Sequence, residues 1–237
     1  AAASDTGAAC TFPEDTRLHY RWATELTTIA QNPLAGPGAP MRGQAELSGS
    51  LTLTSRGLTG GVWLLEGHVT LPQGAAEDLV TAEVRADLTA PFGLEIGRDC
   101  AMRRIGFPEG WLPASRGTLH ALLTPFDVGY GVGQGGTTWA RTHADGRGRL
   151  LVSYTRDDDA PESFRRRRVH YTTLWPEPRK KEAEVTVEAQ DSKVSMHSDG
   201  GWIGTLEERV RYAVHRKGQL VVTEKMRFEL SRTASED

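Results

Sequence analysis

The chain has 237 residues, of which 38% are hydrophobic and 25% charged, and its formal net charge is −3 at pH 7. It is long enough to bury a real core, as one large domain or two small ones. The weak net charge gives no general attraction to nucleic acid or to an anionic membrane, and no apolar run reaches the roughly 18–20 residues that span a bilayer.

The N-terminal segment AAASDTGAAC is small and polar, and it lacks the basic and apolar parts of a signal peptide. It fits the start of a mature exported chain, so we expect residues 1–16 to form a flexible tail. If the protein is exported, Cys10 and Cys100 can form a disulfide; two free thiols are the alternative. The letters GAAC also resemble the end of a bacterial lipoprotein cleavage site, and a lipidated Cys10 could not pair with Cys100.

The first strand is expected from Leu18, where apolar and polar residues begin to alternate. Leu18, Tyr20, Trp22 and Leu26 share one face, which is the period-two pattern of a half-buried strand. A loop rich in Gly and Pro follows at 30–40. In the next part of the chain the same reasoning predicts strands at 45–54, 62–71, 80–88, 92–97 and 99–107.

The second half of the chain also has the pattern of strands and tight turns. A hairpin is expected over 137–156, turning at Asp145-Gly146, and the last strands alternate clearly. The remaining strands are predicted at 168–175, 183–189, 192–214, where a Gly turn divides two strands, and 219–231. The alternation of helices and strands that marks a βαβ fold is absent.

The segment WLPASRGTLHALLTPF, residues 111–126, predicts a single short helix among the strands. Pro113 suits the first turn of a helix, and Pro125 ends the helix or lies just past its end. The apolar residues near one face are Leu112, Leu119, Leu122, Leu123 and Phe126. Gly117 weakens a helix by about 1 kcal/mol relative to Ala, which we explain by close packing of another element against it.

A helix this short is marginal in water and needs tertiary contacts. The fold class expected is therefore all-β and mainly antiparallel, with a curved sheet or barrel of about 11–12 strands wrapped around one central helix at about 112–125. No linker divides the chain, so we expect one domain over residues 17–232 and a short C-terminal tail over 233–237. The helix either fills the interior of the sheet alone or shares it with an apolar ligand.

The sequence PASRGTLHALL, residues 113–123, is similar to a motif of the large lipid transfer proteins, the family of vitellogenin, apolipoprotein B and the microsomal triglyceride transfer protein. In that family the helix at the centre of the N-terminal β-barrel runs roughly N-I-K-R-G-I-L-S-x-L. Arg116, Gly117, Leu119 and Leu122 match this motif, while its Asn and Lys are absent.

A second segment, GRLLVSY at 148–154, resembles the G-x-C-x-T-x-Y strand motif of the same family. Gly148 and Tyr154 match in spacing, whereas Leu150 replaces the Cys, which removes the family's usual disulfide there, and Val152 replaces the Thr. The resemblance implies a β-barrel around a helix over about residues 17–231, used for protein contacts or lipid-associated assembly. It implies no large lipid cavity, because the chain is too short for the family's helical and lipid-storing regions.

The sequence offers no motif for an enzyme, a metal site or a cofactor. It has no HExxH, no HxH and no GxSxG, and its histidines are scattered. We therefore expect a non-enzymatic protein with no cofactor. The basic run Arg165, Arg166, Arg167 and Arg168 is a candidate for binding an acidic protein partner or lipid headgroups, in peripheral contact with a membrane; a solvated loop neutralised by the neighbouring aspartates is the alternative.

The function expected is the binding of a lipid-like apolar ligand, or of a protein partner, by an exported protein of the periplasm, outer membrane or extracellular space. The residues expected to bind the ligand are Leu112, Leu119, Leu122, Leu123, Phe126, Tyr20, Trp22 and Trp63. The alternatives are a periplasmic half-barrel carrier of lipids or lipoproteins and a protein-interaction module with a solid core. An apolar pocket of about 300 Å³ or more, open at one end, would favour ligand binding.

Overall fold

The computed structural model describes residues 10–31, 40–72, 80–129, 137–145, 147–160, 162–174, 183–197 and 202–233. Its strands are β1 Arg17–Ala30, β2 Met41–Thr59, β3 Val62–Thr70, β4 Phe92–Gly97, β5 Met102–Gly106, β6 Thr138–Asp145, β7 Gly148–Arg156, β8 Ser163–Leu174, β9 Ala183–Met196, β10 Ile203–Arg216 and β11 Gln219–Thr233. Its helices are α1 Ala82–Thr89, α2 Pro113–Leu123 and the 3-10 turn η1 Thr124–Phe126.

The described strands form one eleven-stranded sheet in the order β5-β4-β3-β2-β1-β11-β10-β9-β8-β7-β6. Every neighbouring pair is antiparallel. The predicted fold class is confirmed. Of its two forms, a curved sheet or a barrel, the described strands form the curved sheet. Strands β5 and β6 are its edges and do not pair with each other, so the described sheet is open.

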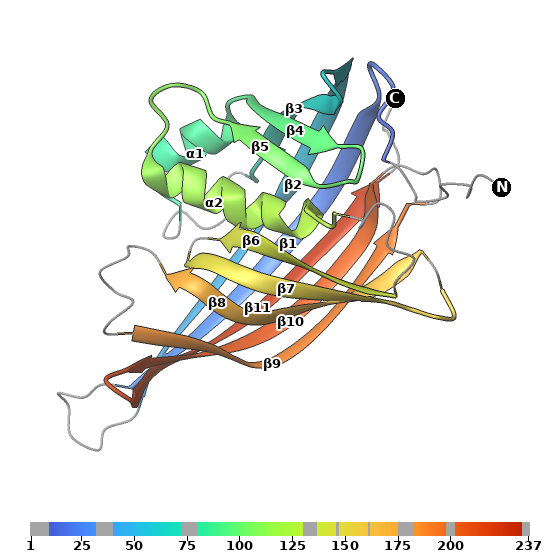
Figure 1. Cartoon of the computed structure of the whole chain (residues 1–237). Helices are drawn as coiled ribbons and strands as arrows, with labels where there is room; N and C mark the ends of the chain where they lie inside the picture. The colour runs from blue at the N-terminus through green and yellow to red at the C-terminus, as the bar shows by residue number, and fades with distance from the viewer. Residues whose placement is uncertain are drawn as a thin grey trace.

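Helix α2 lies inside the curl of this sheet, between the edge strands β5 and β6 and across the concave face of β1 (Figure 1). Pro113 is at the start of α2, and Pro125 lies just past its end in η1, as predicted. Phe126 marks the centre of the core, because its ring centroid lies 4.9 Å from those of both Tyr20 and Trp202. The sheet therefore closes around α2 and not around itself.

The prediction of a strand at 80–88 was wrong, because residues 82–89 form the helix α1. The alternation of Val80, Val84 and Leu88 with polar residues resembles a strand, but Ala, Glu, Arg and Leu are strong helix formers. The Thr81 side chain accepts a hydrogen bond from the backbone N–H of Val84, which caps the helix at its start. Val84 and Leu88, one turn apart, then pack together against the core. The chain thus has a second helix in addition to the central one.

Helix α1 holds the start of α2 in place. The Asp87 carboxylate accepts hydrogen bonds from the backbone N–H of Leu112, at 2.9 Å, and from the Ser115 hydroxyl, at 2.5 Å. These bonds satisfy polar groups that the first turn of α2 cannot satisfy itself. They also explain why the pKa of Asp87 is lowered, first by the Ser115 hydrogen bond and then by that of Leu112.

The expectation of close packing at Gly117 was wrong. A Cβ built on Gly117 would meet no atom within 4 Å, so this glycine is not required by a neighbour. Gly148, the glycine of the second family-like motif, is different. A Cβ there would lie 1.9 Å from the backbone oxygen of Thr173 on β8, so only glycine fits.

Residues 10–16 are described and lie against the domain, although the sequence predicted a flexible tail up to residue 16. Cys10 and Phe12 are fully buried, and the Phe12 ring contacts both Trp63 and Trp202. Of the expected tails over 1–16 and 233–237, residues 1–9 and 234–237 lie outside the described residues, and Thr233 is the last residue of β11. No helix among the described residues is both long enough and apolar enough to span a membrane.

Candidate functional site

A cavity of about 390 Å³ lies between α2 and the concave face of the sheet. Its helical wall is formed by Thr118, Ala121 and Leu122, which lie one turn or less apart on α2. Its floor includes Trp22 of β1 and Phe228 of β11. Ala121 is exposed and Leu122 is buried, so the cavity meets solvent beside Ala121 and extends inward below Leu122.

One end of the cavity is apolar. Leu47 of β2, Val69 of β3 and Leu88 of α1 line it there, next to Trp22. Val69 and Leu88 belong to the buried core, whereas Leu47 is only partly buried. Burial of an apolar ligand against this end would remove hydrocarbon surface from water on both sides of the contact, which is the main source of affinity for such ligands.

The other end of the cavity is ionic. It lies under β10, β8 and the turn between β6 and β7, and its charged lining residues are Asp145, Arg147, Arg168 and Glu208. Arg168 is central, because its Nη2 donates to Glu208 Oε2 at 2.9 Å and its Nη1 donates to Asp145 Oδ2 at 3.1 Å. The cavity is therefore amphipathic: its lining changes from apolar at β3 to ionic at β8.

These ion pairs keep their charges at neutral pH. Burial alone would raise the pKa of Glu208, but the charges of Arg168 and Arg166 outweigh it and lower that pKa to about 2. The pKa of the Arg168 guanidinium is raised despite burial, because Glu208 and Asp145 favour its charged form. Burial raises the pKa of the Tyr171 hydroxyl, which stays protonated and donates to Asp145 Oδ2 at 2.7 Å. The ionic end is thus a permanent feature of the site.

The concave face continues beyond α2, where several of its apolar side chains are partly exposed. The long strands β1, β2, β10 and β11 extend past the helix (Figure 1), and their registered residues form apolar rows. Next to the cavity one row runs Ala45–Leu26–Met226–Val210, and farther out another runs Met41–Ala30–Val222–Val214. A polar row, Gly43–Thr28–Glu224–Tyr212, lies between them. Most of these side chains are partly exposed, and Met41 is 66% exposed. The cavity therefore lies beside a partly exposed apolar row.

The predicted ligand-binding residues divide into two groups in the structure. Leu122 and Trp22 line the cavity. Leu119, Leu123, Phe126 and Tyr20 are buried in the core below it. Leu112 precedes the first residue of α2 and is 40% exposed, so it does not share the buried face of the helix.

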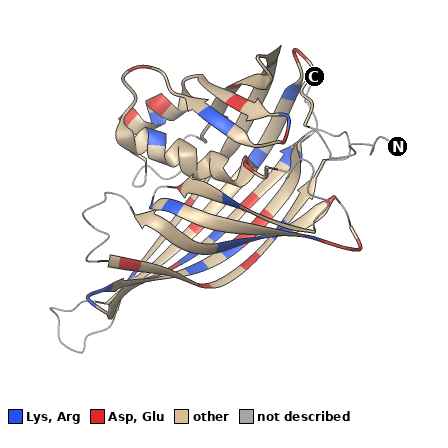
Figure 2. Cartoon of the chain, in the orientation of Figure 1, with Lys and Arg blue, Asp and Glu red and all other residues tan. Residues whose placement is uncertain are grey.

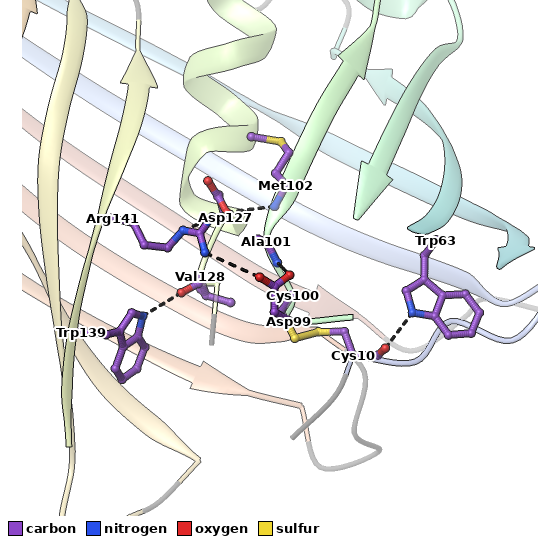
Figure 3. Close-up of a disulfide and its surroundings, with 10 residues drawn as sticks. All are labelled: Cys10, Trp63, Asp99, Cys100, Ala101, Met102, Asp127, Val128, Trp139 and Arg141. Atoms are coloured by element: carbon purple, nitrogen blue, oxygen red, sulfur yellow. Dashed lines mark hydrogen bonds and ion pairs between the residues drawn. A yellow bond between two sulfur atoms is a disulfide. The ribbon is translucent and has the colours of Figure 1, made fainter. Parts of the chain in front are cut away.

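Trp63 lies away from the cavity, at the disulfide (Figure 3). Its indole N–H donates to the backbone oxygen of Cys10 at 2.8 Å. Cys10 and Cys100 form a disulfide with a Cα–Cα distance of 5.2 Å. Because 90 residues separate the two cysteines, closing this loop removes chain entropy from the unfolded state, a contribution of about 4–5 kcal/mol by loop length. The bond fixes the N-terminal segment to the turn between β4 and β5.

Asp127, directly after η1, connects the two edges of the sheet (Figure 3). Its Oδ1 accepts a hydrogen bond from the backbone N–H of Met102 on β5, at 2.9 Å. Its Oδ2 lies 3.2 Å from His143 Nδ1 on β6, and His143 Nε2 lies 2.7 Å from the Tyr154 hydroxyl. Both His143 and Tyr154 are buried. These contacts hold the sheet curled around α2 although its edge strands do not pair.

The four arginines predicted as a partner-binding group are not together on one surface. They lie in β8, where side chains alternate between the two faces, so Arg165 and Arg167 are exposed while Arg166 and Arg168 are buried. The solvated-loop alternative is wrong too, because all four belong to a strand. Acidic and basic residues are interspersed along the strands (Figure 2).

Sequence reasoning missed the ionic end of the cavity, although one signal was present. Leu206, Glu208, Val210 and Tyr212 occupy the inward phase of β10, and Glu208 is the charged residue in that apolar series. A charge in the inward phase of a strand needs a partner. The inward arginines of β8 supply it, but their pairing depends on β9 lying between β8 and β10.

A scan against protein-family models found no match, and a search of the curated proteins found none. Among solved structures, lipovitellin, from a study of its lipid–protein interactions, is similar over 94% of this chain, with a TM-score of 0.56 and 12% identity. The ywiB protein of Bacillus subtilis covers 91% of the chain at 5% identity, but its TM-score is only 0.22. DynF from the dynemicin biosynthesis pathway of Micromonospora chersina covers 100% at 8% identity, with a TM-score of 0.24.

Of these three structures, lipovitellin alone has a TM-score above 0.5, so the fold is compared with lipovitellin. This likeness agrees with the resemblance that the central-helix and strand motifs indicate. The chain covers 26% of lipovitellin. The structure therefore has a distant vitellogenin-like fold, corresponding to about a quarter of the length of that protein.

Proposed function

We propose that this protein is a non-enzymatic binding protein that holds a lipid-like apolar ligand between α2 and the concave face of the sheet. The observation that carries the proposal is the cavity of about 390 Å³, lined by Trp22, Leu122 and Phe228 and open beside Ala121. This volume lies within the range of small-molecule sites, about 300–1,000 Å³. A solid-core interaction module is less well supported, because α2 leaves this space unfilled.

The fold adds support of a weaker kind. Lipovitellin, the similar solved structure, is described for its interactions with lipid. Because the identity is 12%, the likeness concerns the fold, and the ligand of this chain is inferred from its own cavity. The partly exposed apolar row Ala45–Leu26–Met226–Val210 beside the cavity offers further apolar surface to a hydrocarbon chain bound against α2.

We also propose that the protein is exported and acts in the cell envelope or outside the cell. The Cys10–Cys100 disulfide supports this, because such bonds persist in oxidising compartments and are rare in the cytosol. Within this setting, the open, curved sheet suits a carrier that takes up its ligand at a membrane surface or from a protein partner, as a periplasmic lipid carrier does.

The test is native mass spectrometry of the purified protein before and after extraction with organic solvent, followed by addition of a fatty acid or a phospholipid. We expect a bound lipid-sized mass that extraction removes and addition restores. Ala121→Trp places a large ring at the mouth of the cavity from an exposed position, so it should reduce binding at least tenfold without overpacking the core.

Ala114→Trp is the matched control for this variant. Ala114, the second residue of α2, is also exposed but does not line the cavity. It should leave binding unchanged. If no lipid-sized mass is carried and none can be added, or if both tryptophan variants behave alike, ligand binding in this cavity is refuted.

A further inference from the structure

The two ends of the cavity differ in charge, and this difference restricts the ligand. A hydrocarbon alone would leave the ionic end facing it across the cavity, which is unfavourable because charged groups in such a site need polar neighbours. A ligand with an apolar chain and one polar head can satisfy both ends. The chain would lie against Leu47, Val69 and Leu88, and the head would lie toward Arg147 and Arg168.

Most of the ionic groups are already fully used by one another. Glu208 accepts hydrogen bonds from Arg166, Arg168 and Gln190. Asp145 accepts bonds from Arg168, Tyr171 and the backbone of the β6–β7 turn. Arg168 is held between these two carboxylates, so a ligand that bound any of them would have to break a buried ion pair, which is costly.

Arg147 is the exception among the charged lining residues. Its Nη2 donates a hydrogen bond to the carboxylate of Glu224, and Glu224 does not itself line the cavity. The Arg147 side chain is 28% exposed, and its guanidinium lies 4.5 Å from the ring centroid of Tyr212. The aromatic ring supports the guanidinium from one side, while the planar fork keeps further N–H donors for a second acceptor.

From this geometry we infer, on the basis of the proposed function, that the ligand is a single-chain amphiphile with an anionic head, and that Arg147 binds the head. A carboxylate or a phosphate monoester can accept two parallel N–H bonds from a guanidinium. The anion either shares Arg147 with Glu224 or takes its place. A cationic head would find its possible partners Glu208 and Asp145 already occupied.

The size of the cavity sets the number of chains. At roughly 30 Å³ for a group of the size of water or a methylene, 390 Å³ accommodates about a dozen heavy atoms. That is one chain of medium length with its head. A diacyl phospholipid would have to leave its second chain outside the cavity.

The test compares ligands that differ only in the head. Isothermal titration calorimetry at pH 7.5 would measure dodecanoate, dodecyl phosphate, dodecanol and dodecylamine against the full chain. At least one anion should bind about tenfold more tightly than the alcohol, the scale of a charge-assisted hydrogen bond, and the amine should bind more weakly than the alcohol. The better of the two anions identifies the head.

Arg147→Gln should lower the affinity for the anion to that for the alcohol and leave the affinity for the alcohol unchanged. Arg149→Gln is the matched control: Arg149 lies in the same hairpin, is exposed and does not line the cavity. Glu224→Gln should strengthen anion binding, because it removes the competing carboxylate.

The outcomes separate this inference from the proposed function. If the alcohol binds but the anions bind no more tightly, or if their advantage persists in Arg147→Gln, the assignment of Arg147 is overturned while apolar ligand binding stands. If the amine binds best, the anionic class is wrong. If none of the four compounds binds, the proposed function fails together with the inference.

Discussion

The concave face of the sheet has two regions that the same strands build in the same way. In β1, Leu18, Tyr20 and Trp22 are almost fully buried, and the Tyr20 ring packs against Phe126 of η1. Leu26 and Ala30 continue the same face of the same strand, yet they remain partly exposed. The alternation that aims a side chain inward is identical in both regions, and only the helical cover differs.

We infer that one part of each long strand stabilises the fold and that the next part of the same strand is available for binding. Under the helix, aromatic rings such as Phe126 and Trp202 pack together and form the core. Next to α2 the close packing ends at the cavity, and most apolar side chains in the rows beyond the cavity are partly exposed. A large exposed apolar surface is a mark of an interaction site.

Phe126→Ala should destabilise the protein by about 3–5 kcal/mol, because it removes a fully buried ring and leaves a cavity between Tyr20 and Trp202. The free energy of unfolding from urea titrations measures the effect. Leu26→Ala, in the uncovered region, should cost roughly 1 kcal/mol or less. If both variants lose the same free energy of unfolding, the two regions of the concave face do not differ in their contribution to stability.

The link between the sheet edges should make stability depend on pH. Burial lowers the pKa of His143, so the folded protein keeps the ring neutral, whereas the unfolded chain binds a proton near pH 6.5. The contribution is therefore fully present above about pH 6.5 and is lost as the pH falls below that value. The pKa of Asp127 is lowered as well: burial opposes the shift, but the hydrogen bond with His143 and the charge of Arg141 outweigh it. Stability is lost again when the pH falls through the acidic range of Asp127.

Urea midpoints at pH 7.5 and 5.5 measure this dependence. In His143→Gln the decrease between the two pH values should be smaller than in the unmodified protein. Burial also lowers the pKa of His120, so His120→Gln serves as the comparison for a histidine outside the edge link. If His143→Gln leaves the pH dependence unchanged, His143 is not the residue that causes the loss of stability between pH 7.5 and 5.5.

Gly117→Ala should give the smallest effect and the opposite sign. Because Gly117 lies in α2 with open space around it, Ala should stabilise the helix by about 0.5–1 kcal/mol. Gly148→Ala is the contrasting substitution, because its new Cβ would meet the backbone of Thr173 and should destabilise the protein. Thermal unfolding shows whether each variant is more or less stable than the unmodified protein. A less stable Gly117→Ala would indicate that another element does pack closely against Gly117.

Most of the strands could be predicted from the sequence, because a strand with one buried face imposes a period of two on its own residues. The prediction failed at 80–88, where that period coincides with helix-forming residues and the capping Thr81. The lining of the cavity was predicted only in Trp22 and Leu122. The other expected residues are apolar and inward-facing too, and periodicity cannot distinguish a core position from a cavity wall.

By itself, the sequence determined the antiparallel β class, the position of the central helix between Pro113 and Pro125, and the inward face of nearly every strand. These features depend on neighbours within a few residues along the chain. Only the tertiary structure decided that the sheet stays open, that Asp127 connects its edges, and that Arg168 meets Glu208 at one end of a cavity. These depend on strands that are far apart in sequence and adjacent only after the sheet has curled around α2, so no local pattern encodes them.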